Sequence, residues 1–265
     1  MIKKINKVLS VCFALALLAT ATVTGTLAYN TRAATTAVAD TTEEIDVELL
    51  QQRRSYDVNG NVTGLESFED GKVLVPLVGS AQYNGKNFDR YGMPTAEGYV
   101  DQIVRVQNVG TGAAYVRVVV AIPAALDDAD AAGNNALHWN LGNRFMPDGD
   151  FSAGNNTNQA FDDVTWKFVQ TAEVNGVESN LYCFTYKTPL AAGEITEAAA
   201  FVGFYLDSRV DVVNGRVLLD GVDTGFADTE VKIPVKAQAV QAYGFAYAED
   251  AFANVPCYPW KNETK

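Results

Sequence analysis

The chain has 265 residues, of which 20 are Lys or Arg, 32 are Asp or Glu and one is His, so its formal net charge is −12. Apolar residues make up 48% and aromatic residues 11%, which is enough for a folded core and excludes a chain that is disordered throughout. An acidic surface repels phosphate backbones and anionic lipid, so we expect no nucleic-acid partner and no electrostatic docking to a membrane.

The N-terminus has the organisation of a secretory signal peptide. Three lysines lie among the first seven residues, and an apolar stretch follows over residues 8–19. This stretch is shorter than the about 20 residues that a bilayer span needs, although a retained anchor stays open as an alternative. Small residues in the −3 and −1 positions predict cleavage between Ala28 and Tyr29. We therefore expect residues 1–28 to be a signal peptide and the mature protein to be secreted.

A short strand follows the predicted cleavage site. Residues 29–42 are rich in Thr and Ala without a core pattern, which indicates a flexible leader. Ile45, Val47 and Leu49 then alternate with acidic residues, as in a β-strand with one buried face. Such a strand either completes its own sheet or adds to the exposed edge of a neighbour. Head-to-tail addition between copies does not close and would produce fibres.

The rest of the chain, residues 43–265, reads as one β-rich domain. Period-two alternation or β-rich composition marks several segments, and Asn-Gly pairs that suit hairpin turns separate them. The predicted strands include 100–107, 115–122, 164–168, 182–186 and 231–239, and the predicted turns are Asn59-Gly60, Asn84-Gly85, Asn175-Gly176 and Asn214-Gly215. These segments predict an all-β fold, an antiparallel two-sheet sandwich.

Three segments do not follow this pattern of strands separated by Asn-Gly turns. Gly110-Thr111-Gly112 lacks the third glycine of a dinucleotide fingerprint and reads as a hairpin turn between two strands. Residues 127–159 are rich in Asn, Asp, Gly and Ala, and we interpret them as a long surface-loop insertion that contains His138. A short C-terminal helix is expected over 247–254, ahead of Pro256.

The search for chemistry is mostly negative, so we expect no enzyme, no catalytic residue, no cofactor and no metal. His138 stands outside any zinc-protease motif, and no nucleophile elbow or phosphate-binding loop is present. The acidic group around Asp127 does not have the spacing of a calcium loop, so solvated loop charge is favoured over a cation site. Trp139 could stack on a sugar, whereas Trp166 lies on the apolar face of its strand and is expected in the core.

The mature part holds two cysteines, Cys183 and Cys257, because Cys12 lies in the predicted signal peptide. In an oxidising compartment they could form one disulfide. Two unpaired buried thiols are an equally good interpretation. Cys183 lies within an alternating aromatic strand, where a small buried apolar residue is the common use of cysteine.

Three segments resemble the TasA and camelysin family of biofilm-matrix proteins. Residues 25–30, Gly-Thr-Leu-Ala-Tyr-Asn, are similar to the signal peptides that a SipW-like signal peptidase processes. Residues 104–118 resemble the family's N-T-G-x-x-x-A/Y-V-R-V strand pair. Residues 237–245 resemble its late A-x-A-V-Q-A-x-G-F segment. The long insertion and the tail from Pro256 to Trp260 have no counterpart in this pattern.

The resemblance implies a jelly-roll-like sandwich from a Gram-positive source and a structural role. It predicts a secreted, extracellular fibre subunit in a biofilm matrix or on the cell surface, a homo-oligomer built by donor-strand insertion. Carried over to this chain, the donor starts near Tyr29 and includes Ile45, Val47 and Leu49. The alternative is a monomeric surface-binding module for glycan or calcium that uses the 127–159 insertion.

Overall fold

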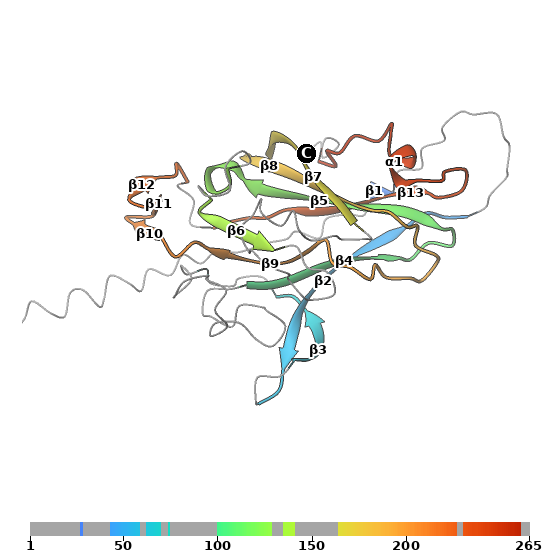
Figure 1. The fold of residues 1–265 in the computed structure, drawn as a ribbon, viewed down its shortest axis with the longest axis horizontal. Helices are drawn as coiled ribbons and strands as arrows, with labels where there is room; N and C mark the ends of the chain where they lie inside the picture. The colour runs from blue at the N-terminus through green and yellow to red at the C-terminus, as the bar shows by residue number, and fades with distance from the viewer. Residues whose placement is uncertain are drawn as a thin grey trace, which may run out of the picture.

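The computed structural model describes residues 27–28, 43–58, 62–69, 74, 100–128, 135–140, 164–226 and 230–260. Over these ranges β-strands are the main regular structure, with 54% of residues in strands and one short α-helix, and the predicted all-β sandwich is confirmed. Two five-stranded sheets lie one above the other in Figure 1.

The first sheet has the strand order β1-β13-β5-β8-β7. Its strands are β1 (Leu27–Ala28), β13 (Val235–Gln241), β5 (Ala114–Pro123), β8 (Val177–Tyr186) and β7 (Val164–Val174). All neighbours in it are antiparallel except β1, which runs parallel to β13.

The second sheet is antiparallel and has the order β3-β2-β4-β9-β6. Its strands are β3 (Val62–Ser67), β2 (Val47–Tyr56), β4 (Val100–Asn108), β9 (Phe201–Leu206) and β6 (Leu137–Asn140). The main core lies between the two sheets and draws buried residues from both, including Val118, Phe184, Val104 and Phe204.

Strand β5 is buried along its whole length. Val116 and Val118 face the core between the sheets, whereas Tyr115 and Val119 belong to two smaller clusters on the outer face of the first sheet. The second face needs a cover of its own, because an apolar sheet face exposed to water is unfavourable. The C-terminal segment provides it.

That segment begins after β13. A helix is present where predicted, but α1 (Ala248–Ala251) is shorter than the expected 247–254. Residues 248–260, called the strap below, run back over the outer face of the first sheet (Figure 1). Strand β13 starts at Val235, later than the predicted Val231, because Pro234 has no amide hydrogen to donate to a ladder.

The Asn-Gly turns behave as predicted where the structure describes them. Asn175 and Gly176 join β7 to β8 with φ angles of 52° and 84°, and Asn214 and Gly215 join β10 to β11 with 52° and 79°. Positive φ at both central residues is the geometry of tight hairpin turns. The second turn belongs to a separate small sheet made of β10 (Val210–Val213), β11 (Arg216–Leu219) and β12 (Val222–Asp223). Asn59-Gly60 and Asn84-Gly85 lie outside the described residues.

The prediction of a hairpin turn at Gly110-Thr111-Gly112 is wrong. Strand β4 before it belongs to the second sheet, and β5 after it belongs to the first. The segment is therefore an arch that carries the chain from one sheet to the other. Alternation along both strands could not reveal this, because each strand takes its ladder partners from remote parts of the chain.

The interpretation of residues 127–159 as a surface loop is wrong at two places. Strand β6 lies within this range and pairs with β9, with Leu137 opposite Leu206. Asp127, at the start of the range, is 2% exposed. The remaining residues of the insertion, apart from 128, 135 and 136, lie outside the described ranges.

Candidate functional site

The arch between β4 and β5 forms a seat for the N-terminal strand. The amides of Val109 and Gly110 both donate to the carbonyl of Asp46 at 3.0 Å, and the amide of Thr111 donates to the carbonyl of Glu44 at 2.9 Å. In return, the amide of Glu44 donates to the Thr111 hydroxyl at 2.9 Å. We call residues 108–112 the N-terminal seat.

The seat requires glycine because the two backbones lie so close together. A Cβ on Gly110 would lie 2.7 Å from the amide nitrogen of Asp46 and would also overlap the carbonyl oxygen of Glu44. A Cβ on Gly112 would lie 2.8 Å from the Cβ of Glu43. The two glycines therefore leave room for the incoming strand, and any larger residue would displace it.

The side chain of Asn108 fixes the conformation of the seat through hydrogen bonds. It is fully buried, and its side-chain amide donates to the carbonyls of Gly112 at 2.8 Å and Leu190 at 3.0 Å. Its side-chain oxygen accepts from the amide of Gly110 at 3.0 Å. The role of Asn108 was missed from the sequence, although its place two residues before the first glycine is a signal for such a side-chain-closed turn.

Of the predicted donor-strand residues, Val47 and Leu49 lie in β2 of their own chain, and Ile45 lies just before that strand. Ile45 and Val47 are buried in the main core, and Leu49 packs against that core. Strand β2 pairs with β4 from Val47 to Gln52 and with β3 from Gln52 to Tyr56. The first half of β2 is thus held by β4 and the N-terminal seat, and the second half by a hairpin.

The outer edge of β13 also accepts an extended segment. Leu27 lies opposite Gln238, and Ala28 lies opposite Ala239, in a parallel pairing. Ala28 is the residue before the predicted cleavage site, and Tyr29 lies outside the described residues. The edge of β13 that faces away from β5 can therefore add a strand.

Cys183 and Cys257 are brought together, although 73 residues lie between them in sequence (257 − 183 − 1). Both are free thiols, Cys183 is buried as expected, and Cys257 packs against the same outer-face cluster. A hydrogen bond between the thiols lowers the pKa of Cys183 to about 7, against the opposing effect of burial and with help from the charge of Arg117.

His138 lies in β6 rather than in a loop. It is buried, stacks on Tyr205 with ring centroids 5.0 Å apart, and its Nε2 lies 2.7 Å from a carboxylate oxygen of Asp207. Burial alone would raise the pKa of Asp207, but hydrogen bonds from His138 and Arg209 outweigh it and hold that pKa well below the usual carboxyl range. The pair ties β6 to the end of β9.

Asp127 and Trp139 are buried in the interior. Asp127 is therefore not the solvated loop charge that the sequence predicts, and Trp139 is not available to stack on a sugar. One Asp127 oxygen accepts from Asn135 at 3.1 Å and from the Trp139 indole at 3.4 Å. The other accepts from Asn180 at 3.0 Å and the Tyr182 hydroxyl at 2.6 Å. With both oxygens occupied and the pKa raised by burial, this carboxyl is structural. Trp166 packs against the core, as predicted.

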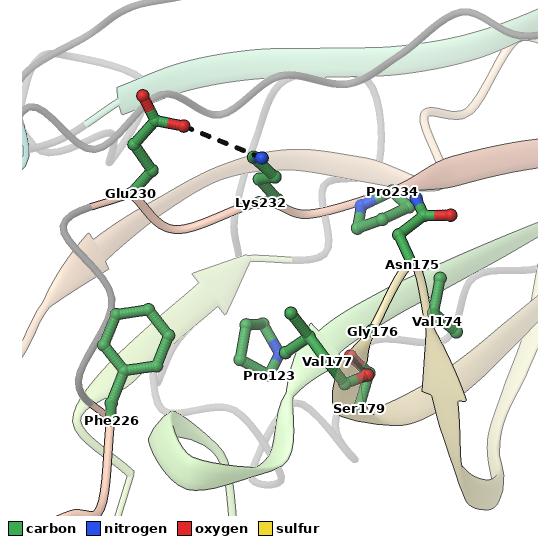
Figure 2. Close-up of a pocket in the computed structure, with 10 residues that line it drawn as sticks. All are labelled: Pro123, Val174, Asn175, Gly176, Val177, Ser179, Phe226, Glu230, Lys232 and Pro234. Carbon is green, nitrogen blue, oxygen red and sulfur yellow. Dashed lines mark hydrogen bonds and ion pairs between the residues drawn. The ribbon is translucent and has the colours of Figure 1, made fainter.

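A pocket of about 230 Å³ opens beside the β7–β8 turn (Figure 2). An ion pair between Lys232 and Glu230, 3.7 Å apart, lies along one side of it. The Ser179 hydroxyl donates to the carbonyl of Val177 at 3.2 Å. No histidine or cysteine lines the pocket. The lining residues are Pro123, Val174, Asn175, Gly176, Val177, Ser179, Phe226, Glu230, Lys232 and Pro234. The Ser179 hydroxyl bonds to a backbone carbonyl and Glu230 pairs with Lys232, so these contacts do not link the serine to a base.

Within the described ranges, no three or more His, Cys, Asp or Glu side chains gather in a way that could hold a metal ion. No helix in the part of the chain that the structure describes has the length and apolar character to cross a membrane.

The N-terminal seat is thus the most specialised arrangement in the described residues, since backbone, glycine and a buried amide all serve to hold one strand. Comparison of the chain with protein-family models, with curated proteins and with solved structures finds no match.

Proposed function

We propose that this protein is a secreted structural subunit of an extracellular fibre, in a biofilm matrix or on a cell surface. A SipW-like signal peptidase would cleave it between Ala28 and Tyr29, and the freed N-terminal strand would insert into a second copy. The observation that carries the proposal is the N-terminal seat, which binds the backbone of Glu44 and Asp46 through hydrogen bonds.

Strand exchange is physically inexpensive at this site. The seat forms hydrogen bonds with the backbone of residues 44 and 46, and the apolar side chains of Ile45 and Val47 pack in the core. A strand from a second copy presents the same groups, so the hydrogen bonds and apolar packing that form between two chains replace those given up within one chain. The leader, residues 29–42, and the β2–β3 hairpin flank the segment that would exchange.

The edge of β13 supports the same proposal. Leu27 and Ala28 occupy it in the full chain, and cleavage after Ala28 would remove both. The mature subunit would then present an unpaired strand edge, which readily pairs with another chain. Head-to-tail pairing of this kind extends into a filament because it does not close.

The first test is negative-stain electron microscopy of residues 29–265 with an unextended Tyr29, beside the same protein without residues 29–50. We expect filaments from the intact form only. Intact protein that stays monodisperse in all assembly conditions would contradict the proposal.

A complementation test separates strand exchange from self-completion. Val47→Asp prevents the strand from inserting, because a charge would enter a fully buried position. Gly110→Ala prevents the seat from accepting a strand, because the new methyl group would overlap its backbone. Neither variant alone should form filaments, but a mixture should form heterodimers in which the Val47→Asp subunit accepts the strand of the Gly110→Ala subunit. Glu48→Ala, on the exposed face of the same strand, is the matched control and should assemble normally. A mixture that contains monomers alone would show that the strand serves its own sheet.

A further inference from the structure

The strap covers a face of the first sheet that would otherwise be open to water. Phe252 and Val255 of the strap pack with Tyr115 and Val240, and Trp260 belongs to the cluster around Val119. Figure 1 shows this segment lying along the side of the first sheet that faces away from the second. The strap is thus held by side-chain contacts and has no strand ladder of its own.

Side chains from the sheet hold the strap at fixed points. Arg117, 5% exposed, donates to the carbonyls of Val255 at 2.8 Å and Pro256 at 2.9 Å, and its guanidinium lies 4.3 Å from the centre of the Phe252 ring. The Tyr258 hydroxyl donates to the carbonyl of Glu173 in β7 at 2.7 Å. The residues on both sides of Cys257 are therefore anchored to the sheet.

Those anchors place Cys257 against Cys183 of β8. The two thiols are hydrogen bonded and lie in the same outer-face cluster. The anchors remove most of the freedom that the strap cysteine would have to lose on pairing, so the pair is preorganised for a covalent bond. Cys183 is the better nucleophile of the two, since its pKa is lowered to about 7 and the thiolate is the reactive form.

We propose that Cys183 and Cys257 form an intramolecular disulfide in an oxidising environment, and that this bond fastens the strap to the first sheet. The proposal does not depend on fibre formation. The oxidant is a disulfide, either oxidised glutathione or the active-site disulfide of a thiol oxidoreductase.

The reaction proceeds by two exchanges. Because Cys183 is 2% exposed, local opening of the strap first gives the external disulfide access to it. The Cys183 thiolate then attacks one sulfur of that disulfide, forming a mixed disulfide and releasing one thiolate. Cys257 then gives its proton to solvent and attacks the Cys183 sulfur, which breaks the mixed bond and releases the second thiolate. Two protein thiols are oxidised and one external disulfide is reduced to two thiols.

The test uses the full chain with Cys12→Ser, which leaves only the two cysteines of interest. The protein is equilibrated in oxidised and in reduced glutathione buffer, and free thiols, intact mass and a non-reduced peptide digest are recorded. We expect thiol titration to fall to zero, the mass to drop by two hydrogens, and one peptide to contain the Cys183–Cys257 link. The melting temperature should rise by roughly 5–15 °C on oxidation.

Hydrogen exchange and a matched variant complete the design. Amides of residues 252–260 should exchange more slowly in the oxidised protein than in the reduced one, because the bond suppresses local opening of the strap. Cys12→Ser with Cys257→Ala should show neither the melting shift nor the slower exchange. Thiols that stay free in folded, oxidised protein, a link between two chains, or a link without slower strap exchange would overturn the proposal.

Discussion

The backbone amide of Gly110 donates to the carbonyl of Asp46 at a separation where no side chain fits between the two strands. One glycine in the arch thus decides whether the N-terminal strand can join the core. The contact holds a strand of the same chain, and the proposed function requires that it also hold the same strand of a neighbouring copy.

Gly110→Ala tests the seat by stability. The new methyl group would push Glu44 and Asp46 away, so several backbone hydrogen bonds and the burial of Ile45 would weaken. We expect a loss of about 2–4 kcal/mol in the free energy of unfolding, measured by urea denaturation. Gly64→Ala is the control, because its Cβ would meet only the Ser55 hydroxyl at 3.5 Å. Equal stability of the two variants would contradict the close-packed seat.

Asp127→Asn tests the buried carboxylate that joins β8 to the start of the insertion. An amide nitrogen in place of one oxygen would face donors from Asn180 and Tyr182, or from Asn135 and Trp139. Leaving buried donors unpaired should cost about 2–4 kcal/mol in chemical denaturation. Glu178→Gln, on the exposed part of β8, should change stability by less than about 0.5 kcal/mol. A similar small effect for Asp127→Asn would contradict a structural role for the carboxyl.

Asp207→Asn tests the ion-paired carboxylate through pH. Because the folded-state pKa of Asp207 is held below its unfolded value, the carboxylate stabilises the fold above the unfolded pKa of about 4 and loses that contribution as pH falls further. The variant should therefore be less stable than the parent by about 1–3 kcal/mol at pH 7, and the difference should shrink below pH ~4.

Unfolding curves at several pH values measure this difference. Asp211→Asn, an exposed carboxyl on β10, is the control and should show little change at any pH. A stability gap for Asp207→Asn that is the same in acid and at neutral pH would contradict the ion-pair explanation.

Arg117→Lys tests how the sheet holds the strap. Lysine keeps the charge but cannot reach the carbonyls of Val255 and Pro256 while also donating to Gln238, as the guanidinium does. We expect a loss of about 1–3 kcal/mol, together with faster amide exchange in residues 252–260. Lys232→Arg, whose side chain is 51% exposed, should have no effect on either measurement. Unchanged strap exchange in Arg117→Lys would show that apolar packing and the remaining hydrogen bonds hold the segment without the guanidinium.

Much of the local structure follows from the sequence. Alternation along residues 115–122 and 182–186 predicts strands, and Asn-Gly at 175–176 and 214–215 predicts hairpin turns that the structure confirms. These patterns succeed because they depend on the two-residue period of a strand and on residues that accept positive φ, both of which are local properties. Cys183 is buried as expected, but on the face of β8 opposite Tyr182 and Phe184, so its burial depends on the strap that covers that face.

The long-range relationships depend on the tertiary structure. Alternation says that β4 and β5 each have a buried face, but not that they lie in different sheets, so the arch was predicted as a hairpin turn. Asp127 and Trp139 lie in a polar, glycine-rich stretch, and only the donors brought by β8 and β6 make that position an interior one.

The sequence by itself determined that the chain is a β-rich protein with an apolar N-terminal strand at 45–49, because strand period and turn residues are encoded locally. Only the tertiary structure decided what that strand meets, which face of β5 the strap covers, and that Cys257 lies against Cys183. The physical reason is that contacts between segments far apart in sequence are selected by the fit of whole surfaces, and no single segment carries that information.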